Sequence, residues 1–151
     1  MTEPRGAALD AAYVDLHSHS TASDGSLAPA AVVAAAHAAG LAAFALTDHD
    51  TVAGIPEAQA AAREVGIRLV PGIELSAVEG AVETHVLGLH LSRMAEIEDG
   101  LTALRAMRYT RAQRIVARLN ELGVRITLDA VLEQAAGGAI GRPHVARAMV
   151  Q

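Results

Sequence analysis

The chain has 151 residues and no cysteine, which excludes disulfides and thiolate metal sites. Its formal net charge of −5 argues against binding to long duplex DNA through bulk charge, but it leaves room for a short anionic substrate. No apolar run reaches the roughly 20 residues that a membrane span needs, and the start lacks the charged and apolar regions of a secretory signal. We therefore expect a cytoplasmic protein without a membrane partner.

Strand and helix patterns alternate between residues 12 and 91. Strands are predicted at 12–16, 41–47, 67–77 and 83–91, and helices at 27–40 and 55–66, each with an early proline and a final glycine. This alternation predicts parallel βα units and an α/β fold. The connection at 78–82 is too short for a helical crossover, so the third and fourth strands are expected to pair antiparallel or irregularly.

A helical pattern follows from residue 95. It predicts a long helix over 95–123, a shorter one over 127–138 and the beginning of another within 139–151. Leucine, isoleucine and alanine gather on one face of the long helix. Arg111, Arg114 and Arg118 lie beside or opposite that face, which predicts solvated side chains.

Candidate metal ligands gather where apolar strands meet loops. His17 and His19 share one face of a strand, because side chains alternate with a period of two. By itself an H-x-H pair is a weak signal. The other strand ends supply further imidazoles and carboxylates, and the carboxyl ends of parallel strands are where sites form in α/β folds. The additional candidates are Asp24, Asp48, His49, Asp50, Glu74 and His85.

Five segments, taken together, resemble one family. The motifs "DLHSHSTASDGS", "ALTDHDT", "PGIELSA", "THVLG" and "GRPHVARAMV" are similar, in this order, to the polymerase and histidinol phosphatase (PHP) superfamily. The similarity is greatest to its nucleotide-phosphatase branch, which contains 3′,5′-nucleoside bisphosphate phosphatases and 5′-to-3′ exoribonucleases. The resemblance implies the N-terminal part of a distorted (β/α)7 barrel and the beginning of a helical inserted subdomain.

The resemblance also implies a division of the chain and a ligand set. The parts are a tail at 1–12, a barrel half with the metal ligands at 13–94 and a truncated helical segment at 95–151. The family's later histidine and D-x-H pair have no counterpart after residue 100, so the missing C-terminal barrel half is expected to be needed for activity. The implied metal ligands are His17, His19, Asp24, His49, Glu74 and His85.

The implied activity is that of a metal-dependent phosphoesterase. It would use two or three divalent cations, Mn²⁺, Fe²⁺ or Zn²⁺, and a metal-bridged hydroxide. His17, His19 and Glu74 are its expected catalytic residues, with Glu74 bridging two ions. The expected substrates are phosphomonoesters of small nucleotides of the 3′,5′-bisphosphate type, or short RNA 5′ ends. The alternatives are a histidinol-phosphatase-like enzyme and an inactive PHP module that binds metal or supports a partner.

Substrate contacts are predicted for three residues in the helical part. A helix that opens with Pro143 presents free N–H groups, arginine suits bidentate phosphate contact, and the resemblance implies that Arg142 and His144 bind substrate. The alternative is a helix-start turn with a solvated arginine. Arg108 falls within the apolar face of the long helix, where an unpaired charge is too costly. We expect it, with Arg105, to act as a phosphate clamp, and the alternatives are a buried salt bridge or a break in the helix.

Four further polar residues near the strands have other expected roles. Asp48 either orients a ligating imidazole as an outer carboxylate or caps the following loop, and for Asp50 we favour the capping role. His37, inside the alanine-rich helix, is expected to be a packing or surface residue. His90 follows His85 by an odd number of residues and is not expected to reach a metal.

Overall fold

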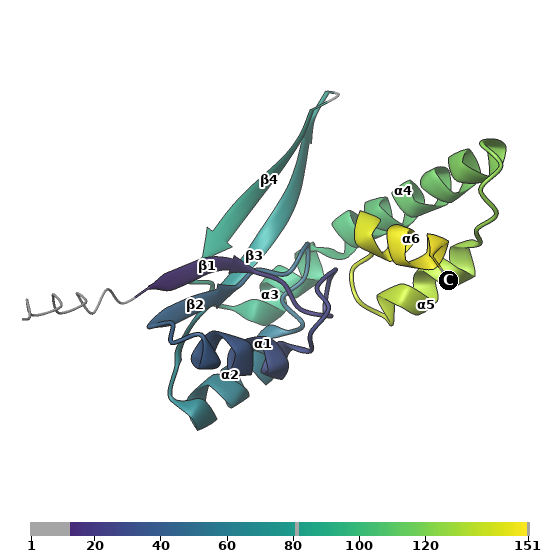
Figure 1. Cartoon of the computed structure of the whole chain (residues 1–151). Coiled ribbons are helices and arrows are strands. Elements are labelled where there is room, and N and C mark those ends of the chain that lie inside the picture. Colours follow the sequence, from purple (N-terminus) through teal and green to yellow (C-terminus); the bar gives the residue numbers. More distant parts are fainter. Residues whose placement is uncertain (1–12, 81, 151) are drawn as a thin grey trace, which may run out of the picture.

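Parallel strands and covering helices build the first part of the chain (Figure 1). The computed structural model describes residues 13–80 and 82–150, so the predicted tail at 1–12 lies outside the described residues. The elements of this part are β1 (Val14–Ser18), α1 (Pro29–Ala38), β2 (Ala43–Leu46), α2 (Ile55–Val65), β3 (Arg68–Glu79) and β4 (Val82–Leu89).

These strands form one sheet in the order β1-β2-β3-β4. The pairs β1–β2 and β2–β3 are parallel, and β3–β4 is antiparallel, which was one of the two alternatives expected for the short connection. β2 is buried along its whole length, whereas most of β1 is exposed. The β3–β4 hairpin is a long ribbon that extends away from the rest of the sheet (Figure 1). This is the α/β architecture expected for the first part of a PHP barrel.

Two helices pack side by side against the sheet, and local sequence sets their ends. α1 and α2 each have a proline in the first turn, where a missing N–H costs no hydrogen bond. α2 ends at Gly66, whose φ of 77° lies in the left-handed region that glycine adopts without strain.

Four helices make up the second part: α3 (Met94–Gly100), α4 (Thr102–Glu121), α5 (Leu128–Ala135) and α6 (Arg142–Met149). The prediction of a single helix over 95–123 was wrong, because the helix is interrupted between Gly100 and Thr102. Leu101 is only 5% exposed and packs into the core of the first part, while α4 leads away from it. Gly100 weakens the helix at the point where it is interrupted.

Two hydrophobic cores lie under these elements. The first combines side chains of α1, β2, α2 and β3 with Leu101, and Phe44 at 1% exposure is its only aromatic member. The second joins α4, α5 and α6 around Val131, which is fully buried. Within the described residues, no helix is long and apolar enough to cross a membrane. The candidate site lies at the edge of the first part that faces the second.

Candidate metal centre

Six imidazole and carboxylate side chains converge at the carboxyl ends of β1 and β2 and on the β3–β4 hairpin. They form three overlapping groups whose possible ligand atoms lie within 4.8 Å of one another. These groups are His17, His19 and Glu74; His19, Asp24 and His49; and His49, Glu74 and His85. All six ligands predicted from the resemblance are therefore brought together.

Glu74 lies between the groups and is 4% exposed. Its Oε2 atom lies 2.7 Å from Nε2 of His17 and 2.8 Å from Nε2 of His19. Its Oε1 atom lies 2.7 Å from Nδ1 of His85. Each carboxylate oxygen thus faces a different set of imidazoles, which is the arrangement required of a carboxylate that bridges two cations.

His49 lies between Asp24 and Glu74, and the nitrogen on its Glu74 side is buried without a hydrogen-bond partner. Asp24 Oδ1 lies 2.9 Å from Nδ1 of His19, and Asp24 Oδ2 lies 3.7 Å from Nε2 of His49. Nδ1 of His49 is buried and makes no hydrogen bond. An unsatisfied buried nitrogen is costly in a protein interior, and a bound cation would satisfy it. The residues present therefore fit a centre of nitrogen and oxygen ligands for divalent metals.

The charges of these groups depend on one another. Burial opposes the ionisation of Asp24, yet the hydrogen bond to His19 and the charges of His49 and Arg108 lower its pKa to about 2. Burial and the nearby Arg108 charge lower the pKa of His49 to about 4. The centre thus keeps an ionised carboxylate beside a neutral imidazole near neutral pH, and these are the forms that bind metal.

Backbone hydrogen bonds hold the ligand-bearing segments in register. His49 forms an isolated parallel bridge with Glu74. The Asp50 N–H donates to the Glu74 carbonyl at 3.0 Å, and the Glu74 N–H donates to the Asp48 carbonyl at 3.2 Å. These bonds extend the β2–β3 pairing past the end of β2. His49 and Glu74 are therefore fixed relative to each other by the main chain.

The loop that carries Asp24 is tied to the strand ends by Asp48. Its carboxylate accepts hydrogen bonds from the N–H and hydroxyl of Ser20, at 2.7 and 2.6 Å, and from the Ser23 hydroxyl at 2.6 Å. Asp48 was predicted as an outer carboxylate for a ligating imidazole or as a loop cap. Its hydrogen bonds go to the loop before Asp24 and not to an imidazole.

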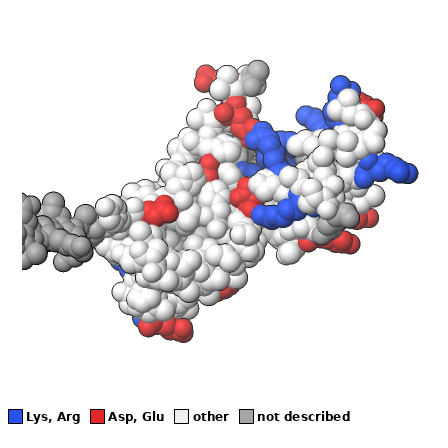
Figure 2. Space-filling view, viewed as in Figure 1, with Lys and Arg blue, Asp and Glu red and all other residues white. Residues whose placement is uncertain are grey.

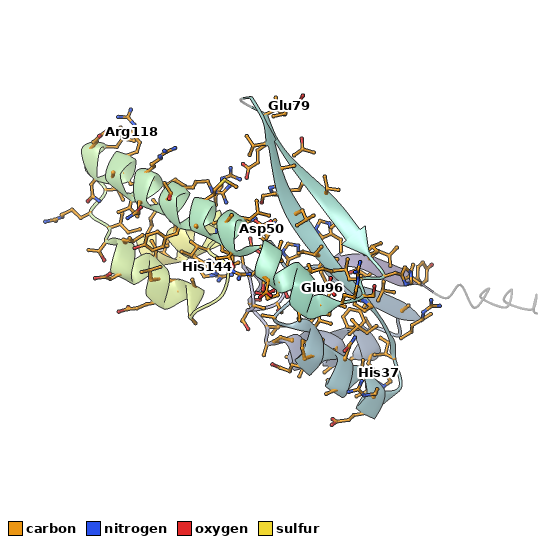
Figure 3. The ribbon with its side chains drawn as sticks, turned by 180° about the vertical axis from the view of Figure 1, so that it is seen from behind. His37, Asp50, Glu79, Glu96, Arg118 and His144 are labelled. Carbon is orange, nitrogen blue, oxygen red and sulfur yellow. The ribbon has the colours of Figure 1, made fainter. Side chains whose placement is uncertain are left out.

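Asp50 has a different role from the predicted capping role, which was wrong. Its Oδ1 accepts from the Ser76 N–H at 2.8 Å, and its Oδ2 accepts from Nε of Arg108. Arg108 also donates to the Ser76 hydroxyl at 2.7 Å and is only 4% exposed. Arg108 is therefore the partner in a buried salt bridge, which was the alternative to a phosphate clamp. Asp50 lies where the first part meets the helices (Figure 3).

The remaining predicted substrate contacts lie on α6. His144 is 1% exposed, and its Nδ1 accepts the Gly141 N–H at 2.9 Å, so this N–H at the helix start is not free. Arg142 is exposed and its Nη2 lies 2.5 Å from Oε2 of Glu83. His144 is thus enclosed at the junction (Figure 3), while Arg142 remains open to solvent.

Glu83 and its partner Arg111 lie beside the centre, and the sequence did not predict this pair. Glu83 pairs with Arg142 and, at 2.5 Å, with Arg111, so the prediction of a solvated Arg111 was wrong. Glu83 precedes His85 by two residues on β4, and strand periodicity alone would place both on one face.

The other arginines and His37 lie away from the metal centre or pair with other residues. Arg105 pairs with Glu98 at 2.6 Å. Arg114 is exposed, and so is Arg118, which pairs with Glu121. The exposed His37 lies away from the centre (Figure 3).

The chain belongs to the PHP family, because the family model for the PHP domain matches residues 15–133. A 5′-3′ exoribonuclease of Haemophilus influenzae is 41% identical over 138 residues, which cover 91% of this chain and 50% of that protein. A 3′,5′-nucleoside bisphosphate phosphatase of Chromobacterium violaceum is 37% identical over 141 residues, 92% of this chain and 50% of that protein. The chain therefore spans about half the length of these relatives.

A solved structure has the same fold. A Bifidobacterium adolescentis protein, assigned as a metal-dependent phosphoesterase, matches with a TM-score of 0.82 and 39% identity. The match covers 91% of this chain and 49% of that one. The expectation of the N-terminal part of a PHP fold is thereby confirmed.

Proposed function

We propose that this chain is the metal-binding part of a phosphoesterase that hydrolyses phosphomonoesters of small nucleotides, such as 3′,5′-bisphosphates, or of short RNA 5′ ends. The observation that carries the proposal is the set of three histidine–carboxylate groups that share Glu74, His19 and His49. The names of the relatives, an exoribonuclease and a nucleoside bisphosphate phosphatase, support the nucleotide substrate class.

The proposed ligands divide between two or three divalent cations, Mn²⁺, Fe²⁺ or Zn²⁺. His17, His19, Asp24, His49, Glu74 and His85 would hold them. When bound, such ions lower the pKa of water and neutralise the charge of a phosphoryl group. Glu74 and His49 are both buried, and each belongs to two of the three groups.

A pocket next to the centre supports the substrate class. It measures about 240 Å³ and lies between the hairpin and α4. Val78, Leu104 and Met107 form its apolar walls, and it is also lined by Ser76, Glu83, Arg108 and Arg111. Ser76 follows Glu74 by two residues on β3, so the pocket begins about 7 Å along the strand from the proposed metal ligand. We propose that a nucleoside lies here and that the exposed Arg142 contacts a phosphate.

We propose a division of the chain near residue 94, although Ile97, Leu101 and Leu104 of the second part pack with the first core. Residues 13–94 contain all six proposed ligands, and residues 95–151 supply one wall of the pocket and Arg142. The part that this chain matches is about half of each relative, and we propose that a C-terminal barrel half completes the active site.

The test combines metal analysis with a phosphate-release assay. We expect the purified chain to bind Mn²⁺ or Zn²⁺, to gain thermal stability from it and to lose that gain with chelator. A protein that also contains the C-terminal half should release phosphate from adenosine 3′,5′-bisphosphate, and Glu74→Gln should abolish this. Faster hydrolysis of histidinol phosphate would support the alternative enzyme class. Bound metal without turnover in either protein would show an inactive module.

A further inference from the structure

Glu83 is a single carboxylate with three partners from three elements. Its carboxylate lies 3.4 Å from Nε2 of His85, which is also on β4. It also accepts hydrogen bonds from Arg111 on α4 and Arg142 on α6. The two arginines occupy different oxygens, Oε1 and Oε2. Glu83 is therefore a carboxylate whose position is set by two side chains of the helical part.

His85 lies between two carboxylates. Its Nδ1 is 2.7 Å from Oε1 of Glu74, and its Nε2 is 3.4 Å from Oε1 of Glu83, at the long end of hydrogen-bond distances. A neutral imidazole has one N–H and one lone pair. If Nδ1 offers its lone pair to a cation held by Glu74, the N–H must be on Nε2, where Glu83 is the acceptor.

We propose that Glu83 is a positioning residue of the metal centre, which accepts the Nε2–H of His85 and so keeps the Nδ1 lone pair directed toward Glu74 and its cation. This inference rests on the proposed metal-dependent function. Arg111 and Arg142 hold the Glu83 carboxylate in place. The helical part thereby influences a ligand that it does not contact itself.

A purely structural salt bridge would have a different energetic signature. The side chain of Glu83 is 26% exposed, and those of Arg111 and Arg142 are 28% and 61% exposed. Ion pairs this accessible contribute little to folding stability. By contrast, removing the carboxylate that orients a metal-bound histidine typically weakens metal affinity about 10- to 100-fold. Metal affinity, rather than stability, is therefore the quantity that distinguishes the two roles.

The test measures Zn²⁺ and Mn²⁺ binding by calorimetry for the chain and three variants. Glu83→Ala should weaken binding roughly 10- to 100-fold with only a small change in melting temperature. Glu83→Gln, which keeps an oxygen acceptor, should restore part of the affinity. Glu121→Gln is the matched control, because Glu121 forms an exposed pair with Arg118 at the C-terminal end of α4, and this variant should bind like the wild type.

Nitrogen NMR of histidine-labelled protein gives a second readout. With Zn²⁺ bound, the His85 signals, assigned with His85→Gln, should show a protonated Nε2 and a metal-bound Nδ1. The opposite tautomer, or wild-type affinity in Glu83→Ala, would overturn the positioning role while leaving the metal centre intact. Failure of the wild-type chain to bind either metal would overturn the proposed function and this role together.

Discussion

Glu74 is the residue that joins the candidate ligands into one centre. It is almost fully buried, and its two oxygens face the imidazoles of His17 on β1, His19 just after it and His85 on β4. The sequence motif "GIELS" marked it as a carboxylate at a strand end, and the structure adds its central place among the groups. The hydrogen bonds of His17 and His85 and the charge of His49 lower its pKa against the effect of burial.

Arg108 should matter most for folding. Arg108→Met would leave the fully buried Asp50 carboxylate without its cation, and breaking such a pair costs about 3–5 kcal/mol. Urea unfolding measures the loss. The exposed Arg118→Met should change the unfolding free energy by no more than about 0.5 kcal/mol. Adding Asp50→Asn to Arg108→Met should recover part of the stability, and equal losses in the two single variants would contradict this interpretation.

His144 should contribute to the pH dependence of stability. Burial and the Arg147 charge lower its pKa below the ordinary value of 6.5, since protonating Nδ1 would also break the hydrogen bond from Gly141. Between the two pKa values the unfolded chain binds more protons than the folded chain, so stability rises with pH there. Stability is therefore lost as the pH falls through about 6.5.

The measurement compares the unfolding free energy at pH 7.5 and 5.5 in metal-free wild type and in His144→Gln. The wild type should lose more stability over this interval, whatever the difference at pH 7.5. The two proteins differ only at residue 144, so the difference between the two slopes isolates His144. An equal slope would mean that the folded chain protonates His144 as readily as the unfolded chain does.

At the scale of elements, the turn between His19 and Asp24 depends on Gly25. A Cβ at this position would lie 2.4 Å from the His19 carbonyl oxygen, so Gly25→Ala must open the loop. We expect metal affinity to fall roughly 10- to 100-fold, as when groups that orient ligands are disturbed, and titration calorimetry would check it. Gly100→Ala is the control because its Cβ meets nothing within 4 Å. Unchanged affinity in Gly25→Ala would show that the loop adapts.

Elements with a strong local signal were predicted well. The parallel pairing of β1, β2 and β3 and the gathering of the candidate ligands followed from periodicity and the family motifs, and an antiparallel β4 was one of the two alternatives for the short connection. Glu74 and His85, however, lie inside β3 and β4 and not at strand ends. The interruption between α3 and α4 did not, because the burial of Leu101 depends on a core formed by distant residues. The partners of Asp50 and Arg111 were missed for the same reason, since each pair joins residues far apart in the sequence.

At the scale of the whole molecule, only one of the two hydrophobic cores lies in the part of the chain that carries the candidate metal ligands. The first core includes residues of β2 and β3, next to His49 and Glu74, and the second stabilises α4, α5 and α6 without providing any of the grouped ligands. Tyr13, Val14 and Leu16 on or beside β1 are exposed although their sequence pattern is that of a buried strand. Periodicity reports which residues can be buried, and it does not report what covers them.

Arginines join the two parts, and Figure 2 shows basic and acidic side chains meeting along the junction. Arg108 binds Asp50, Arg111 and Arg142 bind Glu83, and Arg147 donates to the Asp24 carbonyl at 2.9 Å. Screening shortens the reach of exposed charges from about 10 Å at 0.1 M salt to about 3 Å at 1 M, but affects buried pairs much less. High ionic strength should therefore weaken the accessible pairs of Glu83 and loosen the helices, while the buried Arg108–Asp50 pair stays formed. Salt concentration thus becomes a means of varying how tightly the helices are held, with no change to the sequence.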